Sequence, residues 1–261
     1  MNLDKFEPLT AKHHSKLKFT AVTSYQHAKN DQWCPLLAKE VIPAAAHFPV
    51  VFPTTGLAAP VAILSFTPGG NRYVADNGSW QAAYLPLHYQ RYPFSLGNLV
   101  ANTGDCGNNS DDDADSTGDE TGKNAATLAV LIDADAEQFA SDSGTPLFTA
   151  DAGECIPSAA LQGIKKELQL YQEEFLGTKK IVQQLRQAGV LVPAKLDIKL
   201  DDGEIKAITG FSIVDMARIA KLDEQLRAFW VKIGLMKIIE AHLNSIAVLI
   251  PKPEQSTAAQ D

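Results

Sequence analysis

The chain has 261 residues, of which 45% are hydrophobic and 21% are charged, a composition typical of a folded globular protein and not of a disordered one. Its formal net charge of -8 argues against nucleic-acid binding, because phosphate binding needs clustered Lys and Arg and the sequence has no basic stripe. The length predicts one domain or two closely packed halves. We take the chain as a single domain spanning 1–261, with its core at 30–250 and mobile tails at 1–15 and 252–261.

Neither a targeting segment nor a membrane span is expected. The N-terminus lacks a basic region followed by an apolar run, so no secretory signal is predicted. The most apolar segment, 229–250, contains four ionisable residues, which favours a buried or interface helix over a membrane span. The three cysteines lack the spacing of a disulfide framework or a zinc site, so we expect a cytoplasmic protein.

The first third of the chain predicts an antiparallel β-meander interrupted by short helices. Residues 17–22 could pair as an edge strand, and 38–48 predict a short helix that Pro49 stops. Residues 50–52 and 61–66 are short, β-branched and bounded by Pro and Gly, as is typical of buried strands.

The stretch 71–94 carries the most information. Its Asn77-Gly78 dipeptide favours positive φ at both corners of a two-residue turn, which predicts a hairpin between Tyr73-Val74 and Trp80. Pro86 fits the first turn of a helix, and Pro93 would end that helix.

Residues 102–124 form an acidic insert with almost no apolar side chains. Such a segment cannot bury enough surface to offset its ordering entropy, so a disordered surface loop is expected. A strand resumes at 128–132, which places the insert between two neighbouring strands.

The second half is predicted to be helical. Ser158 fits an N-cap, and apolar residues then recur at alternating spacings of three and four until Gly189, which predicts one long amphipathic helix. Its apolar stripe fits either core packing or a coiled-coil partner, so an oligomer contact through 158–188 is the alternative. A hairpin is expected at 196–211, and two helices are expected at 215–229 and 235–250 with Gly234 between them.

These elements predict an α+β fold. An antiparallel, meander-rich N-terminal half would pack on a helical C-terminal half that contains one long helix and a small hairpin.

Several separated motifs between about residues 30 and 250 resemble the SapC family of bacterial proteins. They are Pro35-Leu36 with Glu40, His47-Phe48-Pro49-Val50-Val51-Phe52, Asn71-Arg72-Tyr73-Val74, Gly78-Ser79-Trp80, Tyr84-Leu85-Pro86, Arg91-Tyr92-Pro93-Phe94, Gly144 with Leu147-Phe148, Thr178 in the long helix, Asp202-Gly203 and Ala241-His242-Leu243-Asn244-Ser245. The resemblance implies a link to bacterial surface layers and to pathways with flavin-dependent halogenases and outer-membrane receptors, without a settled biochemical activity. The insert departs from the usual family length.

Familiar catalytic and metal-binding patterns are missing from the sequence. It has no Gly-x-Ser-x-Gly elbow, no Gly-x-Gly-x-x-Gly turn and no His-Glu-x-x-His helix. The acidic run that starts at Asp111 lacks the Gly and Glu of a calcium loop, and the histidines share no ligand spacing. We therefore predict no cofactor and no metal.

The aromatic stretch together with one upstream carboxylate is the candidate ligand site, formed by Glu40, Trp80, Tyr84, Arg91 and Tyr92. The Arg91 guanidinium could bind a ligand carboxylate while the rings stack on a flat ligand. Alternatively, the aromatics close the core and Arg91 pairs with a buried carboxylate such as Glu40 or Asp76.

Two functions follow from these alternatives. The leading hypothesis is a non-catalytic accessory or binding protein that has a protein partner or a small amino-acid or peptide ligand. The second is an enzyme that acts on a small amino-acid-like or peptide substrate between Trp80 and Arg91. A polar pocket with convergent ionisable groups would favour the enzyme, and a flat apolar patch, especially along the long helix, would favour the interaction protein.

Overall fold

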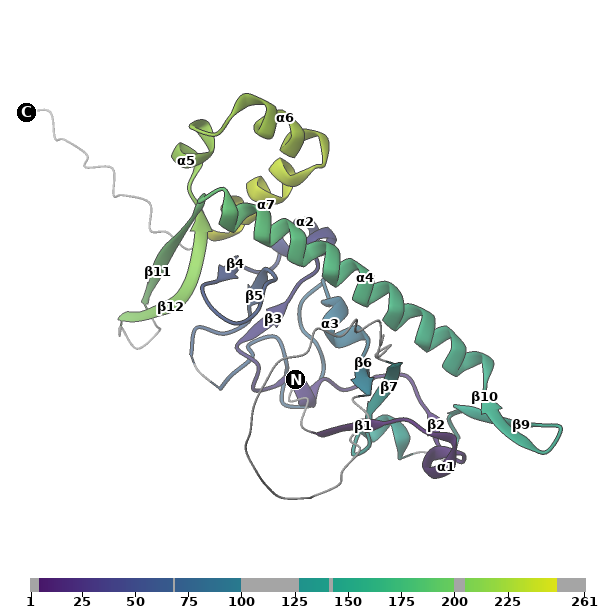
Figure 1. The fold of residues 1–261 in the computed structure, drawn as a ribbon. Coiled ribbons are helices and arrows are strands. Elements are labelled where there is room, and N and C mark those ends of the chain that lie inside the picture. The colour runs from purple at the N-terminus through teal and green to yellow at the C-terminus, as the bar shows by residue number, and fades with distance from the viewer. Residues whose placement is uncertain (1–4, 68, 100–126, 141–142, 200–204, 248–261) are drawn as a thin grey trace, which may run out of the picture. The chain divides into compact units, whose positions relative to one another are not determined.

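The computed structural model describes residues 5–67, 69–99, 127–140, 143–199 and 205–247. These residues form two compact units, one from the described parts of Thr20–Tyr92 and Gln169–Asp261 and the other from those of Asp4–Phe19 and Pro93–Leu168. Antiparallel sheets in the N-terminal half and helices in the C-terminal half confirm the predicted α+β class (Figure 1). That the two units make one domain stays a prediction, and the predicted loop 102–124 and tail 252–261 lie outside the described residues.

The first unit is built on a five-stranded antiparallel sheet in the order β11-β12-β4-β5-β3. Its strands are β3 (Trp33–Pro35), β4 (Val50–Pro53), β5 (Val61–Ile63), β11 (Leu191–Lys199) and β12 (Ile205–Val214). The two predicted short strands and the predicted hairpin at 196–211 are all present. Apart from the last residue of β4, β4 and β5 are buried along their length, as their run of apolar residues predicts.

Short helices surround this sheet. They are η2 (Gln26–Ala28), η3 (Ala38–Glu40), α2 (Val41–Ala45), α3 (Leu87–Gln90), α5 (Met216–Ala220), α6 (Glu224–Lys232) and α7 (Leu235–Ala247). The last of them, α7, packs against α2 and β4. Gly234, at a φ of 77°, separates α6 from α7 as the sequence predicts.

The predicted helix at 215–229 is wrong, because the structure divides it into α5 and α6. Asp223 is the N-cap of α6, and its carboxylate accepts the N–H groups of Gln225 and Leu226 at 2.8 and 3.3 Å. An aspartate that binds the backbone N–H groups after it starts a helix instead of continuing one.

The second unit contains a three-stranded sheet in the order β1-β7-β6, which consists of β1 (Phe6–Pro8), β6 (Phe94–Leu99) and β7 (Thr127–Asp133). The insert therefore connects two antiparallel neighbours, as predicted. Two further pairs are β2 (Lys18–Phe19) with β8 (Thr145–Pro146) and β9 (Phe148–Asp151) with β10 (Glu154–Pro157). The helices α1 (Ala11–His14) and η4 (Glu137–Phe139) complete it.

The predicted mobile tail at 1–15 contains ordered elements. Phe6–Pro8 pairs with β7 across more than a hundred residues of sequence, and α1 follows it. Backbone pairing with a distant strand leaves no local pattern, so the sequence of this segment could not disclose it.

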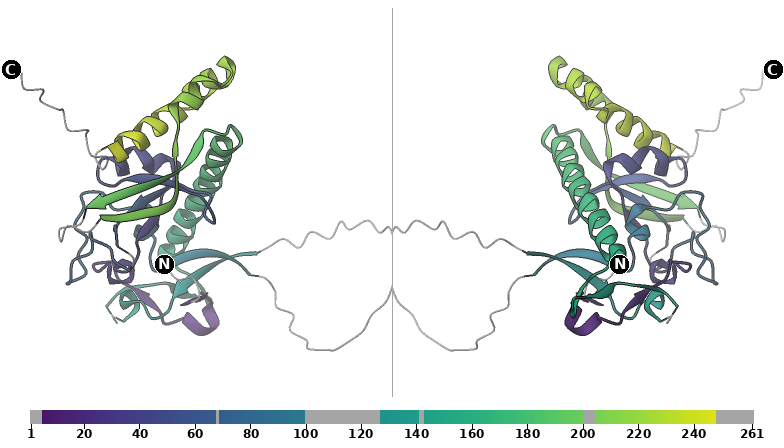
Figure 2. Two further views of the ribbon diagram at one scale, coloured as in Figure 1. Left: turned by 90° about the vertical axis from the view of Figure 1, so that its left-hand side faces the viewer. Right: turned by 90° about the vertical axis from the view of Figure 1, so that its right-hand side faces the viewer.

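The long helix α4 (Ala159–Gln187) confirms the strongest pattern in the sequence (Figures 1 and 2). Ser158 Oγ accepts the Leu161 N–H at 3.2 Å, as an N-cap does. At the other end Gly189 has a φ of 67°, and the Val190 N–H bonds the Leu185 carbonyl at 3.3 Å. No helix among the described residues is both long and apolar enough to cross a membrane.

The Asn77-Gly78 turn is present but differs from a two-residue hairpin. Of these two residues Gly78 alone has positive φ, at 81°, and its N–H bonds the Ala75 carbonyl at 2.9 Å. The flanking segments meet in a single antiparallel bridge between Val74 and Trp80. The Asn77 side chain explains the difference, because its oxygen accepts the Ser79 N–H at 3.0 Å and closes a local turn.

A buried histidine joins the sheet to α7. His242 is fully buried, and its Nε2 accepts the Val214 N–H at 3.1 Å, so its Nδ1 carries the proton and donates to the Val50 carbonyl at 2.6 Å. Ser245 completes the connection, since its hydroxyl accepts the Val50 N–H at 2.9 Å. Burial lowers the pKa of His242 to about 4.

This neutral histidine makes stability depend on pH. An unfolded histidine has a pKa of about 6.5. Between about pH 4 and about pH 6.5, His242 is therefore protonated in the unfolded chain and neutral in the folded protein. The stabilisation is complete above about pH 6.5 and falls by up to roughly 3 kcal/mol as the pH drops to about 4. Urea unfolding of the parent and of His242→Gln from about pH 7.5 to about pH 4 measures this loss as the difference between the two curves. Equal slopes for both proteins would contradict it.

Candidate functional site

Glu40 is the centre of the predicted site and is a buried acceptor. It is the last residue of η3, directly before α2, and is 1% exposed. Its Oε2 accepts the Leu37 N–H at 2.9 Å, and its Oε1 accepts the Tyr84 hydroxyl at 2.9 Å and the Leu87 N–H at 2.7 Å. These bonds connect the η3 segment to the start of α3. Burial raises the pKa of Glu40, and the three hydrogen bonds oppose that rise.

Tyr84 and Trp80 extend this network through the aromatic core. The Trp80 indole Nε1–H donates to the Tyr84 carbonyl at 2.8 Å, and the Tyr84 ring lies parallel to that of His47 with centroids 6.4 Å apart. Trp80 also contacts the rings of Tyr73 and Tyr89 at 6.0 and 5.5 Å. Burial, followed by the charge of Glu40, raises the pKa of Tyr84. These contacts match the alternative in which the aromatics close the core.

Arg91 contacts aromatic groups from two elements. Its guanidinium lies 4.7 Å from the centre of the Tyr171 ring on α4, and its Nη2 lies 3.3 Å from His88 Nδ1. Burial lowers the pKa of Arg91 and raises that of Tyr171 to about 12. Burial, followed by the Arg91 charge, holds the pKa of His88 well below its ordinary value, which favours a neutral ring that can accept from the guanidinium.

The two carboxylates that the sequence suggested as partners of Arg91 bind other groups. Glu40 accepts from Tyr84 and from two backbone N–H groups, as described above. Asp76 lies in an exposed turn, where its carboxylate binds the Lys29 ammonium at 2.7 Å and has its pKa lowered by that bond.

Tyr92, the last predicted site residue, stacks on a histidine from far upstream. Its ring lies parallel to that of His27 with centroids 3.6 Å apart and an interplanar angle of 8°. Tyr92 is 7% exposed, so the face of its ring that stacks on His27 is covered by the protein itself. The structure thus joins Glu40, Tyr84 and Trp80 directly. Arg91 contacts Tyr171 and His88, and Tyr92 stacks on His27, all of them outside the predicted set.

The predicted site residues leave out other members of this buried cluster. Cys34 is fully buried, and burial followed by the Glu40 charge raises its thiol pKa. The Tyr89 hydroxyl donates to Asp31 at 3.1 Å, and the Thr178 hydroxyl on α4 accepts the Ala38 N–H at 2.8 Å. Tyr89 could have been found from its spacing of three from Tyr92, but Cys34 offers no pattern, because a lone cysteine is usually a small core residue.

The chemistry available at this cluster is limited. A thiol with a raised pKa stays protonated and is a poor nucleophile, and the Glu40 carboxyl already accepts three hydrogen bonds within the protein. Among the described residues no three His, Cys, Asp or Glu side chains gather in a way that could hold a metal ion.

An open site with the chemistry predicted for Arg91 lies instead at Arg72. Its guanidinium lies 5.2 Å from the centre of the Tyr73 ring and 5.6 Å from that of Phe66. Arg72 lines a cavity of about 200 Å³ together with His47 and Ser245, and a second cavity of about 300 Å³ together with Lys29. A cation and rings beside a cavity can bind a small anion.

The Glu40 network predicts a specific order of stability. Glu40→Ala leaves the Leu37 and Leu87 N–H groups without their acceptor in the core, and should cost roughly 2–4 kcal/mol. Glu40→Gln keeps one oxygen and should cost less than the alanine variant. Glu167→Ala, an exposed change on α4, is the control and should cost under about 0.5 kcal/mol. Urea unfolding of the three variants measures the order, and a Glu40→Ala protein as stable as the Glu167→Ala protein would contradict it.

Comparison with known proteins identifies the family. None of the curated proteins and none of the solved structures matches the chain. The SapC family model matches residues 9–249, nearly the whole chain, in agreement with the resemblance found in the motifs. The chain therefore belongs to the SapC family.

Proposed function

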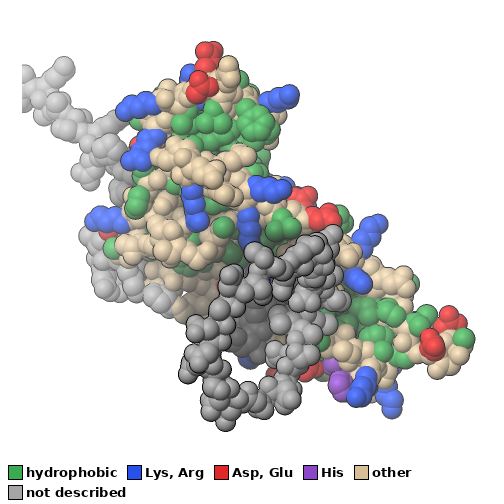
Figure 3. Space-filling view, viewed as in Figure 1, with side chains coloured by type: hydrophobic (Ala, Val, Ile, Leu, Met, Phe, Trp, Pro, Cys, Tyr) green, Lys and Arg blue, Asp and Glu red, His purple; other side chains and the backbone are tan. Residues whose placement is uncertain are grey.

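We propose that this protein is a non-catalytic accessory protein that acts by binding a protein partner. An apolar patch on α5, α6 and the residue that follows α6 carries the proposal. It is formed by Met216, Phe229, Val231 and Ile233, which are 47%, 46%, 65% and 43% exposed. Figure 3 shows hydrophobic side chains, in green, gathered over this part of the first unit. Exposed apolar surface of this kind marks interaction sites.

The local structure explains why these side chains face outward. Trp230 is 1% exposed and packs into the core with Val182 and Leu235, so it fixes which side of α6 is buried. Its neighbours Phe229 and Val231 therefore point away from that side, because consecutive residues on a helix project about 100° apart. Each Å² of apolar surface left in water here costs roughly 25 cal/mol of free energy. A partner that buried these side chains would remove that cost.

The region between Trp80 and Arg91 also supports a non-catalytic function, because its polar groups and rings are bound within the protein. The carboxyl of Glu40, the indole of Trp80 and the ring of Tyr92 are each engaged by other groups of the protein. Such a network rigidifies a core. Family membership adds the context, and we infer from it a role in bacterial surface-layer or in uptake- and halogenase-associated metabolism. An oligomer contact through 158–188 stays a prediction, to which Leu170 and Leu176 offer exposed apolar side chains on α4.

The partner surface can be tested with matched apolar-to-polar changes. Tagged parent, Phe229→Gln/Val231→Gln and Leu170→Gln/Leu176→Gln proteins are used to capture partners from the bacterium that encodes the chain. We expect a protein that binds the parent and the α4 variant but is lost, by tenfold or more, from the α6 variant, because apolar anchors dominate such interfaces. All three proteins should melt within a few degrees of each other. Loss with the α4 variant alone would move the contact to that helix, and equal capture by all three would refute the patch.

An enzyme acting on a small amino-acid-like or peptide substrate is the second candidate, and we propose Arg72 as a further location for it beside the predicted region between Trp80 and Arg91. The observation in its favour is the cavity lined by Arg72, His47 and Tyr73, which combines a cation, an imidazole and a ring.

A melting screen with amino acids and short peptides tests this candidate. A ligand whose carboxylate binds Arg72 should raise the melting temperature of the parent and of Lys29→Gln, and should not raise that of Arg72→Gln. Mass spectrometry of the recovered ligand then separates the two functions. A changed mass would establish catalysis, and an unchanged mass would leave binding alone.

A further inference from the structure

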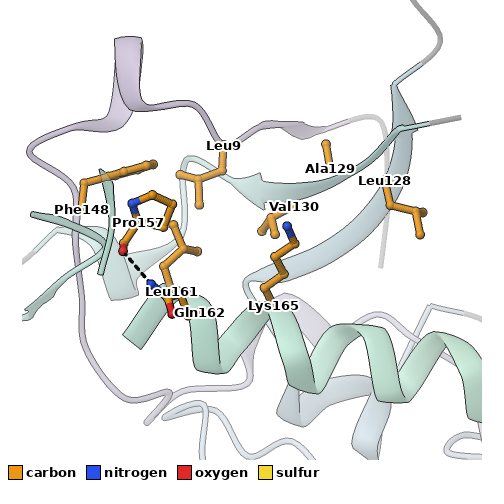
Figure 4. Close-up of a pocket in the computed structure, with 9 residues that line it drawn as sticks. All are labelled: Leu9, Leu128, Ala129, Val130, Phe148, Pro157, Leu161, Gln162 and Lys165. Carbon is orange, nitrogen blue, oxygen red and sulfur yellow. Dashed lines mark hydrogen bonds between the residues drawn. The ribbon is translucent and has the colours of Figure 1, made fainter. Parts of the chain in front are cut away.

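The second unit contains a larger cavity, of about 450 Å³, that none of the functions above uses. Its walls come from β7, from the strands β9 and β10, from Leu9 and from the first turns of α4 (Figure 4). The side chains of Leu9, Val130, Phe148 and Leu161 make these walls apolar. The volume lies within the range of small-molecule sites, roughly 300–1,000 Å³.

Alternate residues of β7 face this volume. Figure 4 shows Val130 pointing toward α4 and Ala129 pointing away from it, as successive residues of a strand do. Leu128 lies on the same side of the strand as Val130 and also lines the cavity.

One charged side chain, Lys165, is present among the described residues that line the cavity. Figure 4 shows it rising from α4 toward Val130. The other polar side chain, Gln162, donates to the Pro157 carbonyl at 3.2 Å and is thereby held at the wall. Lys165 lies on the second turn of a 29-residue helix, whose positive end also favours an anion.

We propose that this cavity binds the free anion of a medium-chain fatty acid, with its chain against the apolar walls and its carboxylate at Lys165. Decanoate has twelve heavy atoms and would occupy about 350 Å³ if each takes roughly the volume of a water molecule, which fits within about 450 Å³. Tetradecanoate, counted in the same way at about 480 Å³, does not fit. The proposal goes beyond the accessory function and needs neither the α5–α6 patch nor the Arg72 cavities.

Chain length and charge of the ligand give the first test. Titration calorimetry of the full chain uses hexanoate, octanoate, decanoate, tetradecanoate and decanol, each below its micelle concentration. We expect affinity to rise about fourfold per methylene from hexanoate to decanoate, as for burial of an aliphatic chain, with no further gain for tetradecanoate. Decanol should bind about threefold or more weakly than decanoate, because it cannot pair with Lys165. Absence of decanoate binding would overturn the site, and equal binding of decanol would overturn the role of the charge.

Variants of this wall give the second test. Lys165→Gln should weaken decanoate about threefold or more and leave decanol unchanged, whereas Lys166→Gln, the same change at the next position, should alter neither ligand. Val130→Phe places a larger side chain in the cavity and should weaken both ligands by tenfold or more. Circular dichroism and melting confirm that each variant is folded. Equal effects of Lys165→Gln and Lys166→Gln, or unchanged binding by folded Val130→Phe, would overturn the assignment.

Discussion

The first unit depends on the hydrogen bonds that the buried carboxyl of Glu40 accepts. It accepts hydrogen bonds from groups 44 and 47 residues away in sequence as well as from its own turn. The elements that it joins are short, because η3 has three residues and α3 has four, and helices of that length are not stable alone. The carboxyl in the core therefore holds these short segments in place, as a long series of backbone hydrogen bonds holds a regular helix or sheet.

His242, Ser245 and Thr178 apply the same principle elsewhere in this unit. Each is buried and bonds the backbone of a segment that is far away in sequence, Val50 for the first two and Ala38 for the third. An unpaired polar group in such a place would cost roughly 1–3 kcal/mol. Removal of one of these side chains would therefore destabilise both the segment that carries it and the segment whose backbone it binds. The family motifs that contain Glu40, Thr178 and His242 can thus be understood as requirements of folding, without any catalytic role.

The parts of the fold that local physics determines could be predicted from the sequence. The period of α4, its Ser158 cap and its closing Gly189 are all local signals, and the hairpin of β11 and β12 follows from its turn residues. The pairing of β1 with β7 and the stacking of His27 on Tyr92 depend on contacts across 60 residues or more, so no window of sequence contains them. The division of the helix at 215–229 is different, because Asp223 is a local cap signal that could have been used.

Residue types alone do not distinguish a ligand pocket from an aromatic core at the candidate site. Arg, Trp and Tyr are typical both of ligand pockets and of aromatic cores, and only burial and hydrogen bonding separate the two. At Glu40 and Trp80 the polar atoms bind within the protein, whereas Arg72, nineteen residues before Arg91, is exposed beside two cavities. The same contrast applies to apolar residues, since Trp230 is sealed in the core while Val231 next to it is 65% exposed.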